Sequence, residues 1–239
     1  MTLPVPAGHA PADADAALEA VRRLPARVEQ ALAGGVDAVQ LRGKSIPGAL
    51  LFGLARELRA ITAHAGVPFL VNDRVDVARA VRAHGVQLGA GSLSIGEARR
   101  LLPPGSLIGY SAHSEAEAAG ATLAGADFVL AAPVFAPGTP KAAGAGAGGR
   151  PHNAPPFGPA RLRRLAAALP IAVYGLGGID AGRVAQVMTP RSDDEATPAG
   201  VAVISAILGS AAAPVADPAA AARTLRHALA ALAPAGAPR

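Results

Sequence analysis

The chain has 239 residues, and 51% of them are apolar, which is enough for one large hydrophobic core. It contains no cysteine, so disulfides, thiolate nucleophiles and cysteine-based metal sites are excluded. The net charge of +5 comes from scattered arginines, and aromatic residues make up only 3% of the chain. Because base stacking needs aromatic platforms, no nucleic-acid partner is expected, whereas a small anionic substrate fits the positive charge.

The N-terminal segment and the hydropathy pattern argue against a secreted or membrane protein. Residues 1–17 lack the basic start and the apolar core of a signal peptide. No stretch of about 18 residues is both uncharged and strongly apolar, so no membrane span is expected. A cytoplasmic location is the prediction, and the lack of cysteine agrees with it.

Short apolar strands alternate with amphipathic helical runs along the chain. The expected strands, in chain order, occupy residues 3–5, 34–42, 67–73, 84–90, 104–111, 125–133, 169–178 and 199–206. The helical runs between them include residues 48–63, 75–83, 114–124 and 159–168. This alternation is typical of βα units around a parallel sheet, whose strands are continuously apolar because both faces are buried.

Eight βα units in a chain of this length predict a (β/α)8 TIM barrel. The alternative is a doubly wound open sheet, which would need a Gly-rich turn after the first strand, and none is present there. We expect a single barrel domain over residues 1–232 and a disordered tail over residues 233–239. Residues 138–154 are rich in Gly and Ala, and because such a segment buries little apolar surface, we expect a mobile lid that carries Lys141.

In a TIM barrel the chemistry lies at the carboxyl ends of the strands. The polar and glycine residues expected there, in chain order, are Gln40, Arg42, Lys44, Asn72, Asp73, Ser92, Ser111, His113, Thr139, Lys141, Gly177, Gly178 and Ser205. Lys44 and Lys141 are the only lysines of the chain. Because arginine supplies the other positive charges, these two compact cations are predicted to be functional groups; the alternative is a chance surface position.

Three kinds of site can be built from these residues. The backbone amides of Gly177 and Gly178, with Ser205 on the next strand, are predicted to bind a phosphate. Asp73 is either a cap of the following helix or a ligand of Mg²⁺. His113 is either a hydrogen-bonded loop histidine or a general acid–base.

Seven motifs resemble, in this order, those of thiamine phosphate synthases and the related TenI-like thiazole tautomerases: "VQLRGK", "VNDRVDVA", "HGVQLG", "IGYSAHSEAEA", "GADFVLAAPVF", "GLGGI" and "VAVISAI". The resemblance implies a TIM barrel that binds a thiazole phosphate. In the synthase, the thiazole nitrogen attacks the methylene carbon of hydroxymethylpyrimidine diphosphate, and pyrophosphate leaves.

The resemblance also implies a role for each matching position. The residues around the diphosphate would be Gln40, Arg42, Lys44, Asn72 and Lys141. Asp73 would be one of two carboxylates that hold Mg²⁺, and Ser111 and Thr139 would complete the pocket. The thiazole phosphate would lie on Gly177, Gly178 and Ser205.

The sequence departs from the synthase pattern where the second Mg²⁺ carboxylate would stand. Synthases continue after the fourth strand with Gly-Gln-x-Asp, whereas this chain has Gly89-Ala90-Gly91-Ser92. Because Ser92 brings no charge, weak or absent Mg²⁺ binding at Asp73 is predicted without diphosphate. The small residues in this segment resemble those of the tautomerase branch. Pro133 and both lysines, by contrast, resemble the residues of the synthase branch.

The main prediction is a TenI-like thiazole tautomerase that needs no cofactor. His113 is its expected base, with Asp73 as the other candidate and Lys141 as a further catalytic residue. The alternative is a thiamine phosphate synthase that uses Mg²⁺ and joins a pyrimidine diphosphate to the thiazole phosphate. A second alternative is a catalytically silent paralogue that only binds phosphate. The sequence leaves a homodimer open.

Overall fold

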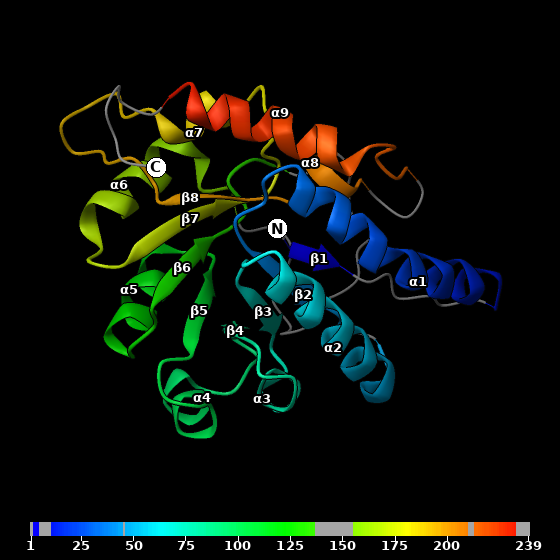
Figure 1. The fold of residues 1–239 in the computed structure, drawn as a ribbon. Helices are drawn as coiled ribbons and strands as arrows, with labels where there is room; N and C mark the ends of the chain where they lie inside the picture. Colours follow the sequence, from blue (N-terminus) through cyan, green and yellow to red (C-terminus); the bar gives the residue numbers. More distant parts are fainter. Residues whose placement is uncertain (1, 5–10, 45, 137–154, 210–212, 233–239) are drawn as a thin grey trace. The chain divides into compact units, whose positions relative to one another are not determined.

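The computed structural model describes residues 2–4, 11–44, 46–136, 155–209 and 213–232, in which strands and helices alternate (Figure 1). The strands are β1 Thr2–Pro4, β2 Val39–Arg42, β3 Phe69–Asn72, β4 Gly85–Leu88, β5 Leu107–Ala112, β6 Phe128–Ala131, β7 Ala172–Leu176 and β8 Gly200–Ala202. The helices are α1 Pro11–Ala33, α2 Gly48–His64, α3 Val75–Ala80, α4 Ile95–Leu101, α5 Glu115–Leu123, α6 Gly158–Ala168, α7 Val184–Met188, α8 Ser205–Leu208 and α9 Pro218–Ala230.

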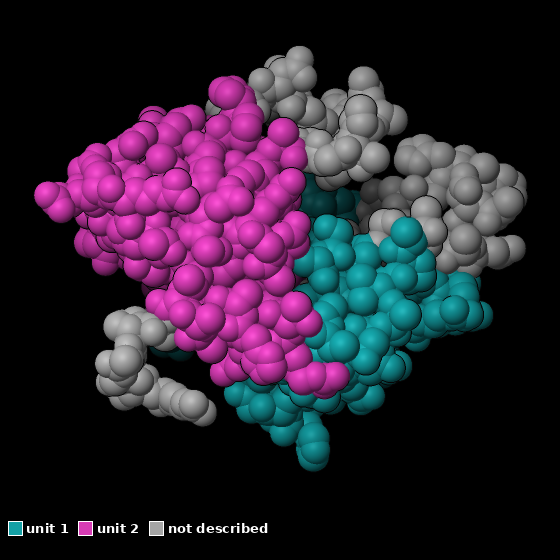
Figure 2. Space-filling model, turned by 90° about the horizontal axis from the view of Figure 1, so that it is seen from above, with its two compact units in different colours: residues 1–109, 204–222 teal, residues 110–203, 223–239 magenta. Residues whose placement is uncertain are grey.

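The chain divides into two compact units, which Figure 2 colours separately. Unit 1 comprises residues 1–109 and 204–222, and unit 2 comprises residues 110–203 and 223–239. Two elements belong to both units, because β5 and α9 each begin in unit 1 and continue in unit 2.

Unit 1 contains a parallel sheet in which β1, β2, β3 and β4 pair in chain order. The register sets Leu41 of β2 opposite Val71 of β3, and Asn72 of β3 opposite Gln87 of β4. Because the carboxyl ends of parallel strands lie at the same edge of a sheet, the residues that follow β2, β3 and β4 lie at one edge. Arg42, Asn72 and Asp73 lie at this edge.

The strands of unit 1 are buried on both faces, as their continuous apolar sequences predict. Val39, Leu41, Phe69 and Val71 have no exposed surface. α2 covers them with a buried apolar face, and α1 packs beside α2. At Gly85 a Cβ atom would overlap the carbonyl group of Leu107, so β4 can approach the start of β5 only because residue 85 is glycine.

Unit 2 contains a second parallel set, in which β6, β7 and β8 pair in chain order. A buried ion pair fastens the polar connector that precedes β8. Arg163 of α6 and Glu195 are each 3% exposed in their side chains, with Nε 2.6 Å from Oε2. Arg163 also donates to the carbonyl of Gln186, and the amide of Arg191 donates to Glu195 at 2.8 Å. A surface-like polar sequence is therefore held by one buried arginine.

The predicted α/β class, with parallel strands that alternate with helices, is confirmed. β1 lies one residue before its predicted position. α3 ends at Ala80 rather than at residue 83, because Arg82 adopts a left-handed backbone with φ of 54°. Within the described ranges, no helix is both long and apolar enough to cross a membrane. The closed eight-stranded barrel and the single domain over residues 1–232 stay predictions.

Candidate active site

The end of β2 brings two cations close to Asp73. Gln40 and Arg42 lie on β2, where Gln40 is 8% exposed and Arg42 is half-buried, and Lys44 follows in the loop. Burial lowers the pKa of the Arg42 guanidinium, and the Asp73 carboxylate opposes that shift. Burial and the Arg42 charge lower the pKa of the Lys44 ammonium, again against Asp73. Arg42, Lys44 and Asp73 therefore form one electrostatic group, here called the strand-end cluster.

Asp73 has an unusual backbone for a residue with a side chain. Its φ is 68°, in the left-handed region that non-glycine residues seldom adopt and that Asp and Asn tolerate best. Two hydrogen bonds hold this conformation, from the Asp73 amide to the Gln87 carbonyl at 2.9 Å and from the Val75 amide to the Asp73 carbonyl at 2.9 Å. Strained residues of this kind gather at functional sites, where the surrounding structure enforces them.

The capping alternative for Asp73 is not what the structure has. α3 begins after Arg74, and the N-cap of this helix makes no side-chain hydrogen bond. The Arg74 guanidinium instead donates two hydrogen bonds to the Asp76 carboxylate, at 2.8 and 2.6 Å. These bonds raise the pKa of Arg74 and lower the pKa of Asp76. The Asp73 carboxylate is therefore not the cap of α3.

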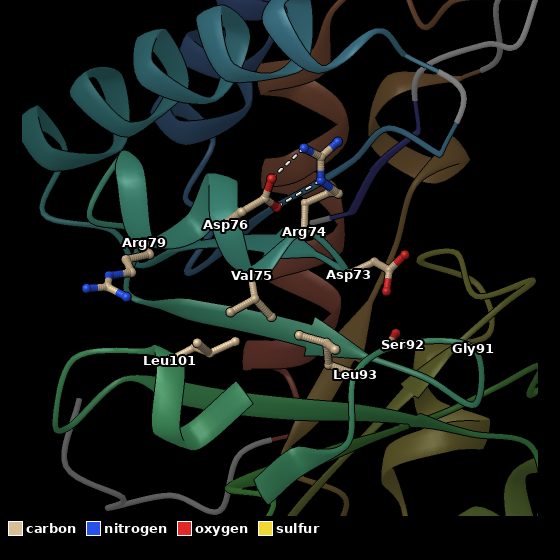
Figure 3. Close-up of a pocket in the computed structure, with 9 residues that line it drawn as sticks. All are labelled: Asp73, Arg74, Val75, Asp76, Arg79, Gly91, Ser92, Leu93 and Leu101. Carbon is tan, nitrogen blue, oxygen red and sulfur yellow. Dashed lines mark hydrogen bonds and ion pairs between the residues drawn. The ribbon is translucent and has the colours of Figure 1, made fainter. Parts of the chain in front are cut away.

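A pocket of about 660 Å³ opens beside Asp73 (Figure 3). Its lining residues are Asp73, Arg74, Val75, Asp76, Arg79, Gly91, Ser92, Leu93 and Leu101. Figure 3 shows Asp73 and Ser92 at the end of the pocket opposite Arg79 and Leu101. The Ser92 hydroxyl accepts a hydrogen bond from the Gly89 amide at 3.0 Å, and the Ser92 amide donates to the Gly89 carbonyl at 2.9 Å. Asn72, the last residue of β3, directly precedes the lining residue Asp73 in the sequence.

The residues at this end of the pocket fit Mg²⁺ only in part. Mg²⁺ is usually held by one or two carboxylates together with waters and substrate phosphates. Asp73 supplies one carboxylate, Ser92 supplies a neutral hydroxyl, and Asp76 is engaged by Arg74. Among the described residues, no cluster of three or more Asp, Glu or His side chains could bind a metal ion. Asp73 therefore fits as a Mg²⁺ ligand when a bound phosphate supplies further oxygens.

In unit 2, the end of β5 carries Ser111, and His113 follows the strand. The ring nitrogen Nδ1 of His113 lies 2.7 Å from the carbonyl oxygen of Ala132. A carbonyl oxygen only accepts hydrogen bonds, so this contact requires a proton on Nδ1 and leaves Nε2 as the ring nitrogen for another partner. Both alternatives for His113 therefore stay compatible with its geometry, because the loop contact uses one nitrogen and the other can exchange a proton.

Glu117 was not among the residues predicted from the sequence. Its carboxylate accepts the backbone N–H of His113 at 2.9 Å, and its own amide donates to the Ser114 hydroxyl at 3.2 Å. The spacing Ser-x-x-Glu before an Ala-rich helix is a known N-terminal capping signal, so the sequence contained the clue. Glu117 fixes the backbone that carries His113.

The loop after β7 has the features expected of an anion site. Gly177 and Gly178 have φ of 104° and 67°, and a Cβ at Gly177 would lie 3.0 Å from Pro133. The amides of Val134 and Phe135 donate to the carbonyls of Leu176 and Gly177. The amides of Gly177 and Gly178, by contrast, donate to no residue in the described part of unit 2. These two N–H groups remain available for a ligand.

The remaining predicted residues are distributed as follows. Ser205 is exposed and opens α8, in unit 1, whereas Gly177 and Gly178 belong to unit 2. Thr139, Lys141 and the predicted lid over 138–154 lie outside the described residues, as does the tail over 233–239. The structure therefore brings Arg42, Lys44 and Asp73 together in unit 1, and Ser111 and His113 together in unit 2.

Comparison with known proteins agrees with the motifs. Residues 14–207 match the thiamine monophosphate synthase family. The chain is 45% identical over 201 residues to the thiamine-phosphate synthase of Methanoculleus marisnigri, covering 84% of this chain and 85% of that protein. It is 40% identical over 200 residues to the thiamine-phosphate synthase of Moorella thermoacetica, covering 84% and 85%. A thiamine phosphate pyrophosphorylase structure from Pyrococcus furiosus aligns with a TM-score of 0.73 and 29% identity, over 96% of this chain and 95% of that one.

These matches bear on the branch as well as on the family. The prediction of an enzyme of thiamine biosynthesis is confirmed. The similar proteins carry the synthase name, so they support the synthase alternative better than the tautomerase that residues 89–92 favoured. The chain belongs to the thiamine monophosphate synthase family.

Proposed function

We propose that the chain is a thiamine phosphate synthase, which joins hydroxymethylpyrimidine diphosphate to thiazole phosphate and releases pyrophosphate. The observation that carries the proposal is the strand-end cluster of Arg42, Lys44 and Asp73. A diphosphate gains negative charge as its bond to carbon breaks, so cations held at that position lower the barrier. A proton shift within one thiazole ring releases no such anion and needs no such cluster.

In the proposed reaction, the lone pair of the thiazole nitrogen forms a bond to the methylene carbon. The electron pair of the broken carbon–oxygen bond leaves with pyrophosphate. Arg42 and Lys44 bind the diphosphate, and Gln40, Asn72 and Lys141 complete its surroundings. Asp73 would hold Mg²⁺ together with the diphosphate oxygens, where the ion would add charge neutralisation. Ser111, His113 and Thr139, the last of which lies outside the described residues, would line the part of the site that receives the rings.

The second half of the proposed site binds the thiazole phosphate on Gly177, Gly178 and Ser205. The support is the left-handed glycine turn, whose two amides have no partner within the described residues of unit 2. The proposal includes closure of the strands into the predicted (β/α)8 barrel over residues 1–232. A homodimer and a cytoplasmic location stay predictions.

The proposal is tested by incubating the purified protein with thiazole phosphate and pyrimidine diphosphate, with and without Mg²⁺. Thiamine phosphate and pyrophosphate should form in equal amounts. Arg42→Gln should lower kcat/KM by about 100-fold, because a preorganised charge at a developing anion is lost. Arg56→Gln, at an exposed position on α2, is the matched control and should leave the rate unchanged.

Other outcomes of the same assay identify the other functions. Isomerisation of a carboxythiazole phosphate, with no consumption of pyrimidine diphosphate, would support the tautomerase instead. Binding of thiazole phosphate without turnover of either kind would support the silent paralogue.

A further inference from the structure

An arginine of α1 fastens the segment that follows Ser205. One terminal nitrogen of Arg27 donates to the carbonyl of Leu208 at 2.8 Å and to the carbonyl of Val215 at 2.9 Å. Arg27 is far from both residues in sequence, and all three belong to unit 1. Its guanidinium is partly buried, and hydrogen bonds donated by a guanidinium are charge-assisted.

Arg27 contacts two adjacent segments, residues 208–209 and 214–215, which are here called the neck. The Val215 amide donates to the Leu208 carbonyl at 3.3 Å, and Gly209 forms an antiparallel bridge with Pro214. Gly209 has a φ of 72°, and a Cβ there would overlap the carbonyl oxygen of Ala213. Only glycine fits this position, so Leu208 and Val215 lie close together, and Arg27 donates to both of their carbonyls.

The neck also sets the position of Ser205. α8 has only 4 residues, and a single helical turn is not stable without tertiary support. The Gly209 amide donates to the Ser205 carbonyl at 3.0 Å, which joins the neck to the first residue of the turn. Ile207 and Leu208 are buried and anchor the same turn in the core. A shift of the neck would therefore shift Ser205.

We infer that Arg27 is a positioning residue for the thiazole phosphate, acting through the neck and α8. The inference rests on the proposed function, in which Ser205 binds that phosphate. Arg27 itself touches no substrate in this scheme. Its loss should loosen Ser205 and leave the strand-end cluster intact, so the two substrates should respond differently. An arginine that only stabilised the fold would not separate them.

The test compares Arg27→Met with Arg23→Met. Met keeps most of the apolar stem and removes the donors. Arg23 lies one turn earlier on α1, is 72% exposed in its side chain and pairs only with Glu19 in the described contacts, so its variant is the matched control. Calorimetric titration should show a roughly tenfold higher Kd for thiazole phosphate in Arg27→Met, the size of one charge-assisted hydrogen bond. Its Kd for pyrophosphate with Mg²⁺ should not change, and Arg23→Met should match the unaltered protein for both.

Two further measurements separate positioning from general destabilisation. Arg27→Lys keeps a charged donor and should restore most of the affinity. Amide hydrogen exchange should quicken over residues 204–209 in Arg27→Met and stay unchanged there in Arg23→Met. Unchanged thiazole phosphate binding in Arg27→Met, or an equal loss for both ligands, would overturn the inference.

Ser205→Asp distinguishes this failure from failure of the proposed phosphate site. Asp is accepted at the start of a helix, but its charge repels an anion there. Weakened thiazole phosphate binding in Ser205→Asp, together with normal binding in Arg27→Met, refutes the inference alone. Normal binding in Ser205→Asp refutes the proposed phosphate site, and the role of Arg27 falls with it.

Discussion

At Asp73 the chain holds a carboxylate on a strained backbone beside two cations. We predict that Asp73→Gly raises the free energy of unfolding by about 0.5–1 kcal/mol, because glycine relieves the left-handed strain at some entropic cost. The same change should abolish the proposed synthase activity. It should also lower the pKa of Lys44 further, since the Asp73 charge opposes the existing downward shift.

Asp73→Asn is the matched variant for this prediction, because Asn tolerates the left-handed region and has nearly the same shape. It should lose activity with little change in stability. Urea unfolding and initial rates measure the two effects separately. A Gly variant that was less stable than the unaltered protein would contradict the assignment of strain to this residue.

Among the elements, α3 shows how one residue ends a helix. The Ala83 amide donates to the Ala78 carbonyl at 2.9 Å across the left-handed Arg82, which is the closing pattern usually built with glycine. We predict that Arg82→Gly raises stability by about 0.5–1 kcal/mol. The Arg82 carbonyl, which accepts from Arg59 at 2.8 Å, is retained in this variant.

Arg79→Gly provides the contrast, because Arg79 lies within α3 and has ordinary helical geometry. It should lower stability by about 1 kcal/mol. Thermal unfolding of the two variants under identical conditions decides the matter, and a lower Tm for Arg82→Gly would refute the prediction.

These elements also show what sequence patterns can predict. The apolar strands were predictable because both faces of β2, β3 and β4 are buried, which leaves a continuous apolar signal. Arg42, Lys44 and Asp73 were each predicted at the end of a strand, and β2 and β3 are neighbours whose carboxyl ends share one edge of the sheet. The left-handed backbone of Asp73 and the early end of α3 were not predictable, because both depend on bonds to neighbouring elements. The contact of Arg27 with Leu208 and Val215 was also not predictable from the sequence, because no periodicity relates residues so far apart.

At the scale of the whole molecule, the two units share elements. β5 and α9 each contribute residues to both units, and each unit is assembled from two separate stretches of chain. Neither unit can unfold completely without breaking an element that it shares. We therefore predict one cooperative transition, with equal calorimetric and van't Hoff enthalpies. Two resolved transitions would contradict the single domain over residues 1–232.

Because the chain has only two lysines, few of its side chains can react with amine-directed reagents. Acylating reagents react with the neutral amine, and the lowered pKa of Lys44 enlarges that fraction at any given pH. Lys141 is the only other lysine, so few side chains compete for such a reagent. A mild activated ester would label the Lys44 amine beside Asp73 as well as the α-amino group of the chain, and a diphosphate bound as proposed would shield the Lys44 amine from it. Acetylation would likewise remove the Lys44 charge, which the proposed function assigns to diphosphate binding, while the arginine side chains would not react.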